Sequence, residues 1–168
     1  GTVEGVPGRF TWTLPVGPTS TGASTVVADV PLSSAAALKF GIEFPEGSVV
    51  GEAQGRLTLD IPPVGAPRYR LTANVAPLTM RLDALDWVKP RGGRGTLVAT
   101  GLFDEVTTVD SISLETATLS TQGRLETSAA GLEAAQLSRL SVDGWFNAPV
   151  SYWPGLTDDS GRVAVRGG

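Results

Sequence analysis

The sequence predicts an all-β protein, an antiparallel meander of short strands that forms a curved, partly open sheet or groove, with a β-sandwich as the alternative. Apolar residues alternate with polar ones in many short segments, the period of two that is typical of half-buried strands. These segments are separated by turn residues, since the 168 residues include 21 glycines and 12 prolines. The length suits one domain, residues 1–168.

The strands expected from this alternation follow one another along nearly the whole chain. Ala35-Ala36-Ala37 favours a helix, but the period of two continues to Phe44 and predicts a strand over 38–44. Residues 128–140 suit a helix or a strand about equally, and we predict a strand. The phase of the alternation changes at Ala76-Pro77, which predicts a bulge or a break at an edge. The predicted strands are 9–14, 26–32, 38–44, 57–61, 71–75, 78–82, 85–87, 97–100, 112–114, 119–125, 128–140 and 163–165.

Glycine and tryptophan add two more specific expectations. Gly-Arg-apolar triplets recur at irregular intervals, as in Gly55-Arg56-Leu57 and Gly123-Arg124-Leu125, and are predicted to begin strands without forming a fixed repeat. Trp87 precedes a turn at Pro90-Arg91-Gly92-Gly93, and its place in the alternation predicts that it packs in the core.

Composition excludes several classes of function. The net charge of −4 argues against a nucleic-acid binder, because phosphate binding needs a basic surface. The chain has no cysteine and no histidine, which removes thiolate chemistry, imidazole metal sites and the Ser-His-Asp triad. Two carboxylate pairs, Asp104-Glu105 and Asp158-Asp159, sit beside expected turns, and neighbouring strand residues point to opposite faces. We therefore expect no enzyme, no cofactor and no metal.

Residues 80–101 and 106–150 carry a degenerate pattern of strand residues and glycines. It runs through Trp87-Val-Lys89-Pro90, Gly95-Thr-Leu-Val-Ala-Thr-Gly101, Val109-Asp-Ser-Ile-Ser-Leu114, Ala117-Thr-Leu-Ser-Thr-Gln-Gly123, Leu137-Ser-Arg-Leu-Ser-Val-Asp-Gly144 and Asn147-Ala-Pro-Val150. This pattern resembles the AsmA-like proteins of Gram-negative envelopes, in particular the YhdP branch related to TamB.

The resemblance implies a largely periplasmic protein whose parent is anchored in the inner membrane. It also implies a β-groove that carries phospholipid to the outer membrane and supports outer-membrane integrity. The chain is far shorter than such proteins and shows no apolar run of about 20 residues. We therefore expect a segment or a small relative, with phospholipid acyl chains, neighbouring segments of a longer parent or other envelope proteins as partners, and no nucleic acid.

Apolar strand faces are the candidate lipid-binding residues, although the same residues would equally form a plain core. They are Leu38, Phe40, Ile42, Phe44, Leu57, Leu59, Ile61, Leu97 and Ala99. Three cations in one turn, Lys89, Arg91 and Arg94, are the candidates for headgroup contact, with a solvated turn as the alternative.

The aromatic residues Trp145, Phe146, Tyr152 and Trp153 suit an interfacial patch, but more often such residues close the end of a core. The second function that the sequence allows is a structural or adhesion β-sandwich that binds protein or glycan through its loops. An apolar trough would favour lipid, and a filled core with exposed aromatic loops would favour the sandwich.

Overall fold

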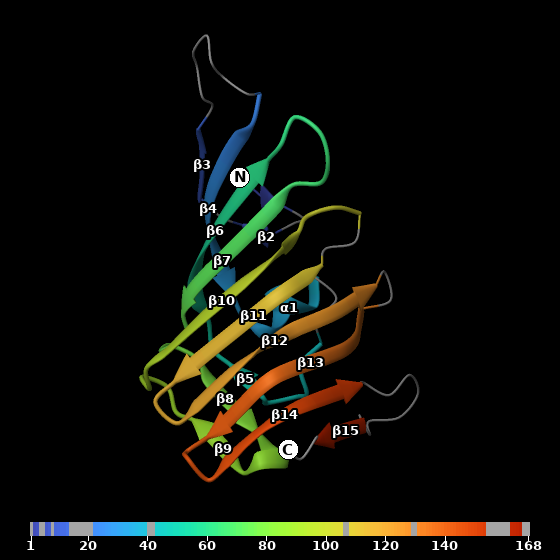
Figure 1. Cartoon of the computed structure of the whole chain (residues 1–168). Coiled ribbons are helices and arrows are strands. Elements are labelled where there is room, and N and C mark those ends of the chain that lie inside the picture. The colour runs from blue at the N-terminus through green and yellow to red at the C-terminus, as the bar shows by residue number, and fades with distance from the viewer. Residues whose placement is uncertain are drawn as a thin grey trace.

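A computed structural model describes residues 2–3, 6–7, 9–13, 22–39, 43–105, 108–128, 131–153 and 162–165. Its main element is a ten-stranded antiparallel sheet with the order β15-β14-β13-β12-β11-β10-β7-β6-β4-β3 (Figure 1). These strands are β3 (Arg9–Thr13), β4 (Ser24–Leu32), β6 (Ala53–Ile61), β7 (Arg68–Asn74), β10 (Gly95–Leu102), β11 (Val109–Thr116), β12 (Leu119–Ser128), β13 (Gly131–Val142), β14 (Phe146–Trp153) and β15 (Arg162–Val165).

Smaller elements lie beside this sheet. A three-stranded sheet, in the order β5-β8-β9, comprises β5 (Val49–Val50), β8 (Thr79–Leu82) and β9 (Trp87–Lys89). A 3-10 turn, η1 (Asp83–Leu85), joins β8 to β9, and a short helix, α1 (Ser34–Lys39), follows β4. Two further strands, β1 (Thr2–Val3) and β2 (Val6–Pro7), pair with each other.

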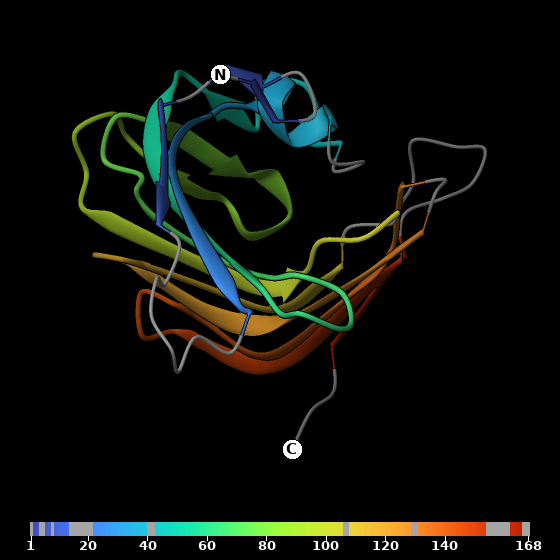
Figure 2. The ribbon, with the colours of Figure 1, turned by 90° about the horizontal axis from the view of Figure 1, so that it is seen from above.

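The large sheet is strongly curved and stays open, with β3 and β15 at its two ends. Seen from above, it bends around the three-stranded sheet and α1, which lie on its concave side (Figure 2). The prediction of an all-β, antiparallel, curved and partly open sheet is confirmed. The alternative, a sandwich of two comparable sheets, differs from this pairing of ten strands with three.

The predicted strand over 38–44 is wrong, because α1 takes residues up to Lys39. Ser33 caps this helix: its Oγ accepts a hydrogen bond from the N–H of Ala36 at 3.2 Å. Alanine has the highest helix propensity, so a capped Ala-Ala-Ala run outweighs the alternation that follows it. Phe44 lies outside any strand, and Phe40 and Ile42 fall outside the described residues.

The strand predicted over 128–140 is confirmed as β13, and the phase change at Ala76-Pro77 marks a change of sheet. After β7 the chain leaves the large sheet for β8, and it returns between β9 and β10. The Pro90–Gly93 turn therefore connects two sheets. Two backbone hydrogen bonds tie these crossovers together, from the N–H of Gly92 to the oxygen of Ala76 at 2.7 Å and from the N–H of Val75 to the oxygen of Gly95 at 2.9 Å.

The core lies between the small sheet and one end of the large sheet. Trp87, on β9, is its largest member and only 5% exposed, as predicted from its place in the alternation. Its indole Nε1–H donates to the Oγ1 of Thr118, in the β11–β12 turn, at 2.9 Å. The core cluster comprises Ala53, Val75, Leu78, Trp87, Leu114, Leu119, Leu140, Val142 and Val150.

Gly-Arg-apolar triplets begin β3 at Arg9 and β15 at Arg162, as predicted, but Gly55 and Gly123 lie inside strands, so the prediction is wrong for these two. The register of β12 against β13 shifts beside Gly123, between Gln122 and Gly123, and again between Glu126 and Thr127. A Cβ at Gly123 would meet the carbonyl oxygen of Gln136 and lie 2.8 Å from the Cα of Leu137. Glycine therefore allows the irregular β13 to approach β12 closely.

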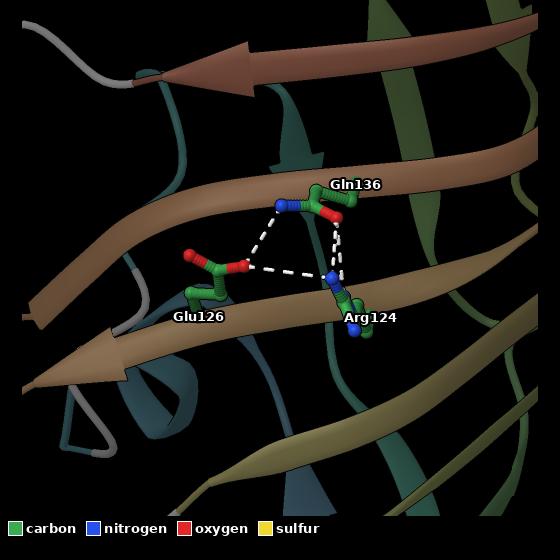
Figure 3. Close-up of polar contacts among 3 residues, drawn as sticks. All are labelled: Arg124, Glu126 and Gln136. Atoms are coloured by element: carbon green, nitrogen blue, oxygen red, sulfur yellow. Dashed lines mark hydrogen bonds and ion pairs between the residues drawn. The ribbon is translucent and has the colours of Figure 1, made fainter.

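A polar cluster holds the stretch between these two shifts in register (Figure 3). Arg124 donates to the Oε1 of Gln136 from Nε at 3.2 Å and from Nη2 at 2.8 Å. The Nε2 of Gln136 donates to the Oε1 of Glu126 at 2.8 Å, and this carboxylate lies 4.0 Å from Arg124 Nη2. Side-chain pairs of this kind help to specify one register across an antiparallel pair.

Candidate functional site

A row of apolar residues crosses the concave face of the large sheet from β4 to β15. Because strand side chains alternate, Leu57 shares this face with Ala53, a member of the core cluster. The backbone register then carries one row of small and aliphatic residues across nine strands. The row is Ala28, Leu57, Leu71, Ala99, Ile112, Gly123, Leu137, Val150 and Val165.

The small sheet covers this face at one end, and at the other end Tyr69 and Val109 are buried as well. Core residues such as Ala53 and Leu119 stand at the first positions of their strands, whereas the middle and the other ends of the strands carry large aliphatic residues that are half-buried and outside the core cluster. We call these residues the inner apolar surface: Leu57, Leu59, Ile61, Leu71, Ile112, Leu125 and Leu132. Half-buried aliphatic side chains on an open concave face are available to an apolar ligand.

The structure brings together five of the nine predicted lipid-binding residues on the concave face. Leu57, Leu59 and Ile61 belong to the inner apolar surface, Ala99 lies in the same row, and Leu97 packs against the core cluster. Leu38 is elsewhere, on α1 and 57% exposed, and Phe44 is 42% exposed outside any strand. Phe40 and Ile42 lie outside the described residues.

Four residues of the inner apolar surface were not predicted as site residues. Leu71 and Ile112 follow the alternation of their strands, so the sequence does predict that their side chains point to the apolar face. Leu125 is in a predicted strand too, and Leu132 lies beyond a shift in register that alternation alone does not reveal. Which strands lie next to one another decides that these residues share a surface, and the pattern within a strand does not carry that information.

Lys89 does not present its charge to solvent, so the expectation of an exposed headgroup contact at this residue is wrong. Its side chain is 2% exposed and its Nζ donates to the oxygen of Leu78 at 2.8 Å. Weaker contacts reach the oxygens of Ala76 and Pro90, both at 3.4 Å. Burial lowers the pKa of Lys89 from its ordinary value, because desolvation disfavours the ammonium. The residue joins the two crossovers between the sheets.

Arg91 and Arg94 are exposed, but they lie far from the inner apolar surface. Arg94 immediately precedes Gly95, the first residue of β10, and the inner apolar surface extends toward the opposite strand ends. The eight residues of β10 span about 23 Å at the usual strand rise. The cationic turn and the half-buried leucines are thus at opposite ends of the sheet.

Tyr69 closes the inner face next to the β10–β11 connection. Its side chain is 8% exposed, and its hydroxyl donates to the oxygen of Thr108 at 2.7 Å. A Cβ at Gly101 would meet the same carbonyl group and lie 3.0 Å from the Cε1 of Tyr69. The chain before β11 therefore folds back over β10 at this point. Burial, with a smaller effect of Asp110, raises the pKa of Tyr69 to about 12.

This pKa gives a prediction for alkaline solution. The folded protein holds the Tyr69 proton to about pH 12, whereas an unfolded tyrosine loses it near pH 10. The stabilisation is therefore complete below pH 10 and disappears as the pH rises toward 12, a change of about 2–3 kcal/mol. Urea unfolding of the wild type and Tyr69→Phe between pH 9 and 11.5 should show the difference in unfolding free energy shrinking as the pH rises. A constant difference would contradict the buried hydroxyl.

The aromatic residues near the C-terminal strands divide into two kinds. Phe146 packs against the core cluster, as expected of a residue that closes a core. Trp145 is 66% exposed in the β13–β14 turn and Trp153 is 41% exposed on β14. The rings of Trp145 and Phe146 are tilted by 60° with centroids 5.7 Å apart. Phe146 therefore closes the core, whereas the exposed rings of Trp145 and Trp153 do not.

Comparisons with known proteins give no match: no family model, no curated protein and no solved structure is significantly similar to this chain. Within the described part of the chain, no group of three or more histidine, cysteine, aspartate or glutamate side chains could hold a metal ion. No helix in that part is long and apolar enough to cross a membrane.

Proposed function

We propose that this chain is a non-enzymatic β-groove module of the AsmA-like type, and that its inner apolar surface holds phospholipid acyl chains. The module would act in phospholipid transport between the inner and outer membranes, in the periplasm, as part of a longer parent anchored in the inner membrane. One observation carries the proposal: seven large aliphatic side chains are half-buried on the concave face of a sheet that remains open.

Acyl chains suit this surface in chemistry and in length. Transfer of an acyl chain from water contributes about 0.8 kcal/mol per buried CH₂, so even partial burial gives useful affinity without a catalytic group. Between Leu57 and Ile112, both on the inner apolar surface, the row crosses three spacings between strands, about 14 Å at the usual separation. One leaflet of a bilayer has a hydrocarbon thickness of about 15 Å, so this part of the row is comparable in length to an extended acyl chain.

The exposed arginines do not determine where the headgroup lies. Because Arg91 and Arg94 stand at the covered end, a phospholipid with its tails on the inner apolar surface would hold its headgroup away from them. The headgroup would remain in solvent at the open side of the sheet, where a polar group keeps its hydration at no cost.

Native mass spectrometry of gently purified protein, with lipid extraction, tests this proposal. We expect bound phospholipid on the wild type and its loss from Leu59→Asp, because a carboxylate on the inner apolar surface disfavours acyl chains. The matched control is Gln122→Asp, an exposed outer position opposite Arg139, which should retain lipid. Circular dichroism must show that both variants are folded. A lipid-free wild type that also takes up none from vesicles would contradict the proposal.

A further inference from the structure

The convex face of the large sheet has a hollow over β4, β6 and β7. These strands are neighbours in the sheet, and the hollow lies between side chains that point away from the inner apolar surface. Strand alternation separates the two faces, so Arg70 and Thr72 point outward while Leu71 points inward. The residues that line the hollow are Asp29, Gln54, Gly55, Arg56, Thr58, Arg70 and Thr72.

Hydrogen-bond donors surround this hollow in a regular arrangement. Arg70 lies opposite Thr58 on β6, and both residues line the hollow. Arg56 lies opposite Thr72, one pair further along the same two strands. Diagonal neighbours in an antiparallel pair are about 7–8 Å apart, within reach of two arginine side chains. Two guanidinium groups and two threonine hydroxyls can therefore contact one small ligand.

Among the charged residues that line the hollow, Arg70 has no carboxylate partner in the ion pairs of the described residues. Asp29 is paired with Arg56, whose Nε lies 3.4 Å from its Oδ1. Asp60 accepts a hydrogen bond from the hydroxyl of Thr25 at 2.9 Å. No ion pair in the described part of the chain includes Arg70. The exposed guanidinium of Arg70 is thus available to an anion.

We propose that this hollow binds a phosphate group, with the guanidinium of Arg70 as its main contact. Arginine presents several N–H donors in a planar fork that matches two oxygens of a phosphate, and the threonine hydroxyls can donate to the remaining oxygens. Asp29 holds the second arginine in place. The site is on the opposite face from the inner apolar surface, so it does not depend on the proposed lipid groove.

Binding of inorganic phosphate at low ionic strength tests the site, measured by calorimetry or by NMR shifts of the β6 and β7 amides. Wild-type protein should bind phosphate, and Arg70→Gln should weaken binding about tenfold, the usual effect of removing one charged hydrogen-bond donor. The matched control, Arg81→Gln, removes an exposed strand arginine from β8 and should leave binding unchanged. Absence of phosphate binding, or equal binding by Arg70→Gln, would overturn the proposal.

A competition experiment distinguishes a lipid phosphate from a soluble phosphate compound as the ligand of the hollow. If vesicles that contain phosphatidylglycerol displace inorganic phosphate from the wild type, the hollow takes a lipid phosphate. If they do not compete, the site takes a soluble phosphate compound. Both results support a phosphate site, which is contradicted if inorganic phosphate binds the wild type and Arg70→Gln equally.

Discussion

Replacement of Trp87 with alanine is expected to lower the free energy of unfolding by about 3–5 kcal/mol. Trp87 is 5% exposed within the core cluster, and loss of its indole leaves a cavity there. The substitution also removes the hydrogen bond from Nε1 to the hydroxyl of Thr118. Urea unfolding followed by circular dichroism measures the change.

Two further tryptophan substitutions separate the contribution of core packing from that of the hydrogen bond and from the loss of an exposed ring. Trp145→Ala is the matched control, since this ring is 66% exposed and its removal should cost less than about 1 kcal/mol. Trp87→Phe keeps most of the packing and should cost about 1 kcal/mol, the value of the lost hydrogen bond, plus a small cavity term. Equal effects of Trp87→Ala and Trp145→Ala would show that Trp87 is not the anchor of the core.

The substitution Gly123→Ala, which adds a single methyl group, is expected to give the second large decrease in the free energy of unfolding. The new methyl group would meet the backbone of β13 at Gln136 and Leu137, and backbone cannot move aside as a flexible side chain can. We expect a loss of about 3 kcal/mol, near the upper end for overpacking. Gln122→Ala changes the neighbouring exposed residue and should alter the unfolding free energy by no more than about 0.5 kcal/mol.

Chemical unfolding of Gly123→Ala and Gln122→Ala under the same conditions measures this difference. If Gly123→Ala unfolds at the same urea concentration as the wild type, β12 and β13 do not approach each other as closely as the structure shows. The shifts in register beside Gly123 would then not require a glycine.

The fold class follows from local patterns, and the division into two sheets does not. Alternation favoured a strand for β13, where the sequence suited a helix about equally well, and it predicted that Trp87 packs in the core. It did not reveal that β8 and β9 form a separate sheet, because each strand has the same period in either sheet. The helix α1 was missed because its cap, Ser33, and its alanines act over one turn, while the alternation that follows extends further.

The sequence predicts that the candidate site is an apolar strand face, but it does not predict which residues border that face. Leu57, Leu59 and Ile61 could be assigned to one face from sequence, and the structure places that face on the concave side. Lys89 could not be assigned correctly, since a lysine in a Pro/Gly turn is normally solvated. Its burial depends on carbonyl groups of Ala76 and Leu78, which only the crossover to the second sheet brings near.

Photo-crosslinking with a phospholipid that carries a diazirine on its acyl chain tests the central claim most directly. Peptide mass spectrometry should locate the adducts on the strands of the inner apolar surface, at residues such as Leu59, Leu71 and Leu125. The outward residues of the same strands should remain unlabelled, with Gln122 as the reference position. Adducts confined to outward or fully exposed side chains, or no adducts at all, would contradict an acyl-chain site on the concave face.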